Sequence, residues 1–111
     1  MMDIDAVVSM ITAHVDRRAA FIAEDEAACL ASGKEYPAPG LRGHLLSISS
    51  CFAAGEYAEG LRRYIDHLHE TDSSMRAQYF TMLQQFAAHL GVDAEKLAVL
   101  RRLDDATFRP Q

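Results

Sequence analysis

The chain has 111 residues, with 11 Lys and Arg against 16 Asp and Glu, and half of its residues are hydrophobic. This length fits a single domain, residues 1–111, and the hydrophobic content is too high for a disordered chain. The net charge of −5 repels phosphate backbones on average, so binding to nucleic acid would need a locally basic face.

The two cysteines, Cys29 and Cys51, both fall inside apolar helical patterns. The chain starts with the acidic stretch MMDIDAVV, where a secretory signal would be basic. No apolar run approaches the roughly 18 residues of a membrane span. We therefore expect a cytoplasmic protein without membrane association, in which both cysteines are reduced, buried side chains; a disulfide between them is the alternative.

The first predicted helix is long and spans residues 3–32. The carboxylate of Asp3 can cap its N-terminus by accepting a hydrogen bond from a free backbone N–H. Gly33 can adopt the left-handed conformation that ends a helix. The stretch that follows, GKEYPAPG at residues 33–40, contains two prolines and two glycines and is predicted to be a linker.

Two apolar seams run along this first helix, rotated by roughly 100° from each other. One seam consists of Ile4, Val8, Ile11, Val15 and Ile22. The other consists of Val7, Met10, His14 and Phe21. Because one seam can face the domain's own core, the second is predicted to be a protein interface, covered most simply by the same helix of a second subunit in a homodimer. The alternatives are one wide buried stripe in a monomer or a helix break near Arg17 and Arg18.

Shorter helices are predicted over residues 41–54, 57–70, 73–90 and 93–105. Their apolar residues recur every three or four positions, and no stretch shows the alternation that a strand requires. Candidate caps for the third of them are Thr71, Asp72 and Ser73, and Asp93 is the candidate cap for the last. The predicted fold is therefore an all-α, single-domain bundle of about five helices, in which a long first helix precedes antiparallel helical hairpins.

Residues 86–103, FAAHLGVDAEKLAVLRRL, resemble the helix-turn-helix family. The matching positions are a small residue, a turn glycine and three packing residues, namely Ala87, Gly91, Val92, Leu97 and Leu100. The resemblance implies a DNA-binding regulator that uses residues 83–103. The positions that would contact bases, however, hold Asp93, Ala94 and Glu95, and carboxylates repel phosphates. DNA binding is therefore retained only as an alternative function.

Residues 52–64, FAAGEYAEGLRRY, resemble the turn of a tetratricopeptide helical hairpin. The matching residues are Gly55, Tyr57, Leu61 and Tyr64. Gly60 stands where that family has an alanine, and no second repeat follows, whereas a solenoid needs at least about three repeats. The resemblance therefore predicts a single helical hairpin.

No catalytic, metal or cofactor signature emerges from the sequence. His67 and Glu70 share a helix face, but two ligands do not make a metal site without help from other helices. The serines at positions 47, 49 and 50 lie in or beside a helix without a nucleophile elbow, and no glycine-rich phosphate loop occurs. We therefore predict no catalytic residues, no metal and no cofactor.

The predicted function is that of a small non-enzymatic regulatory or adaptor protein. It would bind another protein through an apolar helical surface, for example by sequestering or blocking a transcription factor or a secretion component. Besides the helix-turn-helix alternative, a further alternative is a small-ligand binder or enzyme with a site between helices, lined by His44, Tyr64 or His67.

Overall fold

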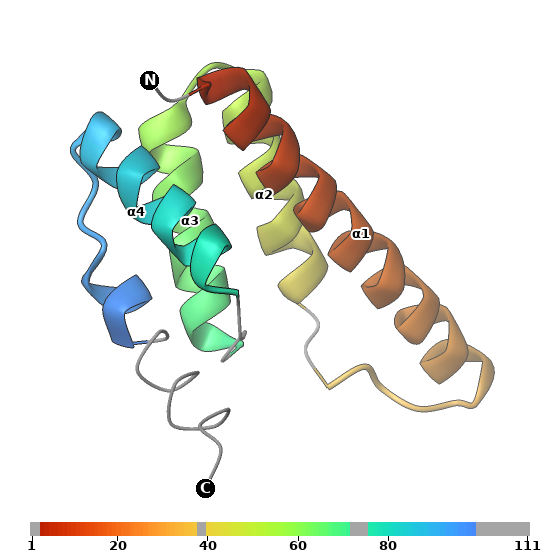
Figure 1. Cartoon of the computed structure of the whole chain (residues 1–111). Coiled ribbons are helices and arrows are strands. Elements are labelled where there is room, and N and C mark those ends of the chain that lie inside the picture. The colour runs from red at the N-terminus through yellow and green to blue at the C-terminus, as the bar shows by residue number, and fades with distance from the viewer. Residues whose placement is uncertain (1–2, 38–39, 72–75, 100–111) are drawn as a thin grey trace, which may run out of the picture.

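The structure is a computed structural model that describes residues 3–37, 40–71 and 76–99 (Figure 1). Its helices are α1 (Ile4–Ala31), α2 (Leu41–Ala53), α3 (Tyr57–Glu70) and α4 (Ala77–Leu90). Residues 95–99 form the start of a further helix, and the described ranges contain no strand. The predicted all-α fold with a long first helix is therefore confirmed. The rest of the predicted helix 93–105 lies outside the described residues.

The local signals at both ends of α1 act as predicted. The Asp3 carboxylate accepts a hydrogen bond from the backbone N–H of Ala6 at 3.1 Å. At the other end Gly33 has a φ of +71°, and the carbonyl of Cys29 accepts hydrogen bonds from the N–H groups of Lys34 at 2.9 Å and Ser32 at 3.1 Å. The helix is continuous over 28 residues, or about 42 Å. The alternative of a break near Arg17 and Arg18 is therefore wrong.

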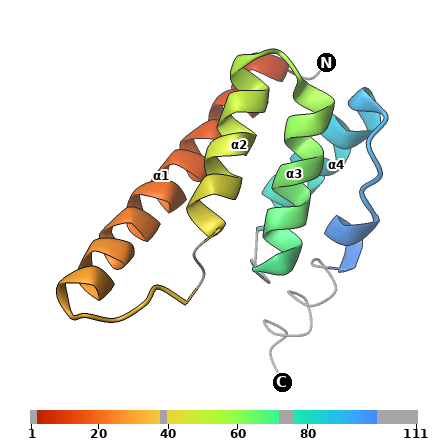
Figure 2. The same cartoon turned by 180° about the vertical axis from the view of Figure 1, so that it is seen from behind.

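The four helices alternate in direction and form a closed ring of contacts (Figures 1 and 2). Helix α2 packs against α1 and α3, and α4 packs against α3 and α1. The diagonal helices α1 and α3 have no Cα atoms within 8 Å of each other, so only side chains connect them. The C-terminal part of α1 extends beyond the other helices, beside the segment that leads back to α2 (Figure 1).

One hydrophobic core lies inside this ring and includes side chains from all four helices and from residues 92–97. The residues of α1 that are buried in it are Val7, Ile11, Val15 and Ile22. This stripe takes Val7 from the predicted interface seam and the other three from the predicted core seam. The inward face of α1 therefore lies between the two seams, and no residue of α1 beyond Ile22 is buried.

Helix α4 begins later than predicted. Arg76, at φ −69° and ψ 152°, is extended, and the helix starts at Ala77 rather than at residue 73. Two of the predicted caps, Asp72 and Ser73, lie outside the described residues. The third, Thr71, is instead the C-cap residue of α3, and its hydroxyl donates to the carbonyl of His67 at 2.8 Å.

The chain turns sharply after α4. Gly91 has a φ of +70°, and Val92 N–H donates to the carbonyl of Ala87 at 2.8 Å. Val92 and Leu97 are both buried in the core, as expected for residues that set the entry angle of the next helix. Asp93 accepts a hydrogen bond from the N–H of Glu95 at 2.9 Å, so it lies just before a helix that begins at residue 95 rather than at 93. In the described ranges, no helix combines the length and the hydropathy needed to cross a membrane.

Gly60 allows α2 and α3 to approach closely. A Cβ atom at this position would lie 3.1 Å from Cε2 of Phe52 and 3.2 Å from Cβ of Cys51. The Cβ of Cys51 is attached directly to the α2 backbone, so it cannot rotate away from the added methyl group. The tetratricopeptide alanine is therefore replaced here by the residue that the helix spacing demands.

We expect Gly60→Ala to lower the free energy of unfolding by about 1 kcal/mol, because the cost of overpacking exceeds the gain in helix propensity. Gly43→Ala is the matched control, since a Cβ there meets open space on α2. It should raise the free energy of unfolding by roughly 0.5 kcal/mol. Urea denaturation of both variants provides the measurement, and equal stabilisation by both would contradict the close approach at Gly60.

Candidate functional site

Polar side chains from α1, α3 and α4 meet in the middle of the bundle. The Nδ1 atom of His14 lies 2.6 Å from the hydroxyl of Tyr64, and that hydroxyl lies 2.5 Å from the hydroxyl of Tyr79. Tyr64 is fully buried, whereas His14 and Tyr79 are half-buried. A chain of three polar groups therefore crosses the diagonal between α1 and α3 and continues to α4.

The environment keeps these groups neutral at pH 7. Burial raises the pKa of the Tyr64 and Tyr79 hydroxyls, so both carry their proton. Burial, followed by the nearby charges of Arg18 and Arg17, lowers the pKa of His14. When Tyr79 donates to Tyr64 and Tyr64 donates to Nδ1 of His14, the proton of the neutral imidazole lies on Nε2.

A second polar pair crosses the same diagonal one turn further along. The Nε atom of Arg18 donates to Nε2 of His67 at 3.0 Å, and His67 is fully buried. Because a guanidinium only donates, Nε2 of His67 must be the acceptor and the proton of the neutral ring lies on Nδ1. This Nδ1 atom is buried without a hydrogen-bond partner. Burial, with smaller contributions from Arg18, His44 and His14, lowers the pKa of His67 to about 4.

Two of the three residues predicted to line a site between helices, His44 and His67, lie side by side. His44 of α2 lies beside His67, with ring centroids 5.9 Å apart, and its Nε2 donates to the carbonyl of Arg63 at 3.2 Å. Tyr64 lies on α3, one turn before His67. The sequence prediction missed Arg18 and Tyr79.

A signal for Arg18 was present in the sequence. It lies seven residues after Ile11 and four before Ile22, so the helical repeat places it in the buried stripe of α1. A charged residue at such a position requires a polar partner inside the bundle. No equivalent signal identifies Tyr79, because a tyrosine at helical spacing also fits an ordinary core position.

A groove of about 470 Å³ opens between α1 and α4 on the outer side of this network. It is lined by Met10, Ala13, His14, Arg17, Leu68, Arg76 and Tyr79. Its volume lies within the range of roughly 300–1,000 Å³ that is typical of small-molecule sites. The buried network thus reaches the surface at His14 and Tyr79.

The four predicted interface residues occupy different environments. Met10 and Phe21 are large exposed hydrophobic side chains, with 48% and 66% of their surface accessible. Val7 is only 4% exposed and packs in the chain's own core, and His14 is half-buried in the polar network. The role of these residues in an interface stays a prediction, and Met10 and Phe21 are the two that are available for it.

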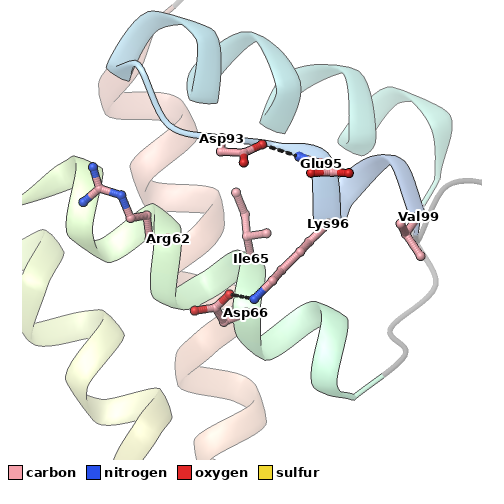
Figure 3. A pocket seen from close by; sticks show the side chains of 7 residues that line it. All are labelled: Arg62, Ile65, Asp66, Asp93, Glu95, Lys96 and Val99. Carbon is pink, nitrogen blue, oxygen red and sulfur yellow. Dashed lines mark hydrogen bonds and ion pairs between the residues drawn. The ribbon is translucent and has the colours of Figure 1, made fainter.

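Residues 93–99, within the segment that resembles a helix-turn-helix, lie over α3 and line with it an open pocket of about 350 Å³ (Figure 3). The residues that line this pocket are Arg62, Ile65, Asp66, Asp93, Glu95, Lys96 and Val99. Lys96 reaches back to Asp66, with 2.5 Å between Nζ and Oδ1. The lysine that could contact DNA is therefore engaged by a carboxylate, beside two further carboxylates that repel phosphate. Leu100, Arg101 and Arg102 lie outside the described residues.

Across residues 3–37, 40–71 and 76–99, no three His, Cys, Asp or Glu side chains are grouped so that they could hold a metal ion. Cys29 is half-buried and Cys51 is buried, and both are free thiols. No family model matches the chain, and no curated protein or solved structure matches it. The geometry of the chain itself is thus the basis for a functional assignment.

The low pKa of His67 predicts that the free energy of unfolding decreases as the pH is lowered. Its folded-state pKa of about 4 lies below the ordinary value of 6.5, so the unfolded chain takes up the proton first. The neutral His67 ring therefore makes its full contribution to the free energy of unfolding above pH 6.5, and this contribution is lost as the pH falls towards 4. Between pH 7 and pH 5 we expect a loss of about 2 kcal/mol in the free energy of unfolding from this group.

His67→Leu provides the check, by urea denaturation at both pH values. The variant should remove most of the loss between pH 7 and pH 5. At pH 7 the variant should be about 1–2 kcal/mol less stable than wild type, because Arg18 loses its acceptor inside the bundle, a cost that removal of the unpartnered N–H of His67 offsets in part. An unchanged pH dependence in this variant would show that His67 does not titrate as its burial requires.

Proposed function

We propose that the protein is a non-enzymatic regulatory or adaptor module that recognises another protein through an exposed apolar flank of α1. We define this surface, the Met10–Phe21 flank, by those two side chains. The observation that supports the proposal most directly is the 66% exposure of Phe21 on a helix that extends beyond the rest of the bundle. Burying such a side chain at an interface contributes roughly 1–2 kcal/mol, so a soluble chain that exposes it gains from a partner.

The two residues are spaced for recognition along a helix. Eleven residues separate Met10 from Phe21, which is about three turns, so both side chains lie on the same side of α1. An amphipathic helix or a groove on the partner can contact both at once. Arg17 lies between them and is exposed, so a partner that also offers a carboxylate gains an ion pair.

A second copy of the chain is the first partner to test, as in the predicted homodimer. A two-fold axis between Met10 and Phe21 would place Met10 of one copy against Phe21 of the other, which is an isologous contact. The same axis would bring the Arg17 side chains of both copies close together. Self-association through this flank should therefore weaken at low ionic strength, where like charges are screened least.

Light scattering after gel filtration, at increasing protein concentration, measures the association. We expect a dimer that Phe21→Glu separates into folded monomers, because a carboxylate cannot be buried in an apolar contact without a large cost. Leu30→Glu is the matched control. Leu30 is 81% exposed and lies nine residues further along α1, on the opposite side of the helix.

If Leu30→Glu separates the dimer and Phe21→Glu does not, the interface lies on the Leu30 side of α1, which contradicts the proposal. A wild-type monomer at every concentration would overturn self-association. The adaptor function would then depend on a different protein, which a pull-down with wild-type and Phe21→Glu baits can identify. If no recovered protein is lost on Phe21→Glu, the proposed use of this flank is wrong.

A further inference from the structure

The groove between α1 and α4 brings two unpaired guanidinium groups together. Most basic side chains in the described ranges are engaged: Arg18 with His67, Arg42 with Glu26, Arg62 and Arg63 with Glu59, and Lys96 with Asp66. Within those ranges the basic side chains without such a partner are Arg17, Lys34 and Arg76. Two of these, Arg17 and Arg76, line this one groove, and no lining residue is acidic. In a chain of net charge −5, this groove is therefore locally basic, which favours an anionic ligand.

The backbone of α4 adds to the positive potential. Arg76 is the N-cap residue of α4, and Tyr79 is its third helical residue, so the groove lies against the first turn of that helix. The free N–H groups of a first turn carry partial positive charge and favour anions. Arg76 makes no side-chain capping hydrogen bond there.

Neutral polar groups line the inner side of the same groove. His14 and Tyr79 are held by the hydrogen bonds that link them through Tyr64. The Nδ1 atom of His14 is used in that network, which leaves Nε2 as the ring atom available to a ligand. These groups are positioned in advance, so binding a ligand does not require ordering them.

The remaining lining is apolar and consists of Met10, Ala13 and Leu68. A bare inorganic anion would leave this part of the groove unfilled. The lining instead matches a molecule with one charged end and one apolar end. Arg guanidinium groups bind carboxylates in a bidentate arrangement, and the apolar side chains can cover a short hydrocarbon.

We propose that this groove binds a small amphipathic carboxylate of the medium-chain fatty acid class. The carboxylate lies between Arg17 and Arg76 at the first turn of α4, and the hydrocarbon packs on Met10, Ala13 and Leu68. This site shares Met10 and Arg17 with the Met10–Phe21 flank, but Arg76 lines only the groove and Phe21 belongs only to the flank. Substitutions at these two positions therefore test the two proposals separately.

Nuclear magnetic resonance titration of the full chain with octanoate tests the proposal. We expect saturable shifts of backbone amides around residues 10–17 and 76–79. The double variant Arg17→Gln with Arg76→Gln should weaken binding by roughly tenfold or more, because charge-assisted hydrogen bonds to the carboxylate are lost. Circular dichroism checks that this variant stays folded, as expected for two exposed side chains.

The matched control is Lys34→Gln, which removes one positive charge from an exposed position outside the groove. This variant and Phe21→Ser should bind octanoate as the wild type does. Octan-1-ol, which has the same chain without the charge, should bind at least tenfold more weakly than octanoate, because it cannot pair with the guanidinium groups.

Several outcomes would overturn the proposal. These are the absence of saturable octanoate binding, equal affinity for octanoate and octan-1-ol, and unchanged binding in the double arginine variant. A titration with inorganic phosphate provides the last comparison. If phosphate and octanoate shift the same backbone amide resonances equally, the groove binds anions without using its apolar lining. That result contradicts an amphipathic ligand.

Discussion

The arrangement of the bundle depends on polar contacts across its diagonal. Helices α1 and α3 do not approach each other closely, and His14 with Tyr64, and Arg18 with His67, bridge the space between them. Apolar side chains alone tolerate small shifts of one helix along another, whereas a buried polar group loses its partner when such a shift occurs. These pairs therefore set the position of α1 along α3.

The same constraint shapes the outer surface of α1. Because His14 and Arg18 turn inwards to their partners, Arg17 faces outwards between Met10 and Phe21. The inner network holds His14 and Tyr79 at the edge of the groove, where Arg17 and Arg76 supply charge. The residues of the buried network and those of the exposed Met10–Phe21 flank thus alternate along one helix.

Much of the secondary structure could be predicted because its signals are local. Asp3 caps the start of α1, and Gly33 and Gly91 follow the ends of α1 and α4, each through contacts among residues only a few positions apart. Helix α4 begins at Ala77 rather than at residue 73, and Thr71, one of the predicted caps for its start, is instead the C-cap residue of α3. Val7, predicted in the interface seam, is buried in the chain's own core, because the two seams differ by about one step of rotation and the neighbouring helices select which face turns inwards.

The sequence by itself determined an all-α chain and most helix ends, since these follow from periodicity and capping within short segments, but it left open whether the long first helix is continuous. Only the tertiary structure decided that Arg18 and Tyr79 join the polar network and that Arg17 and Arg76 face one groove. Such partners are far apart along the chain, between 49 and 50 residues for the bonds across the diagonal. No local pattern encodes contacts of that separation, because they exist only once the helices have packed.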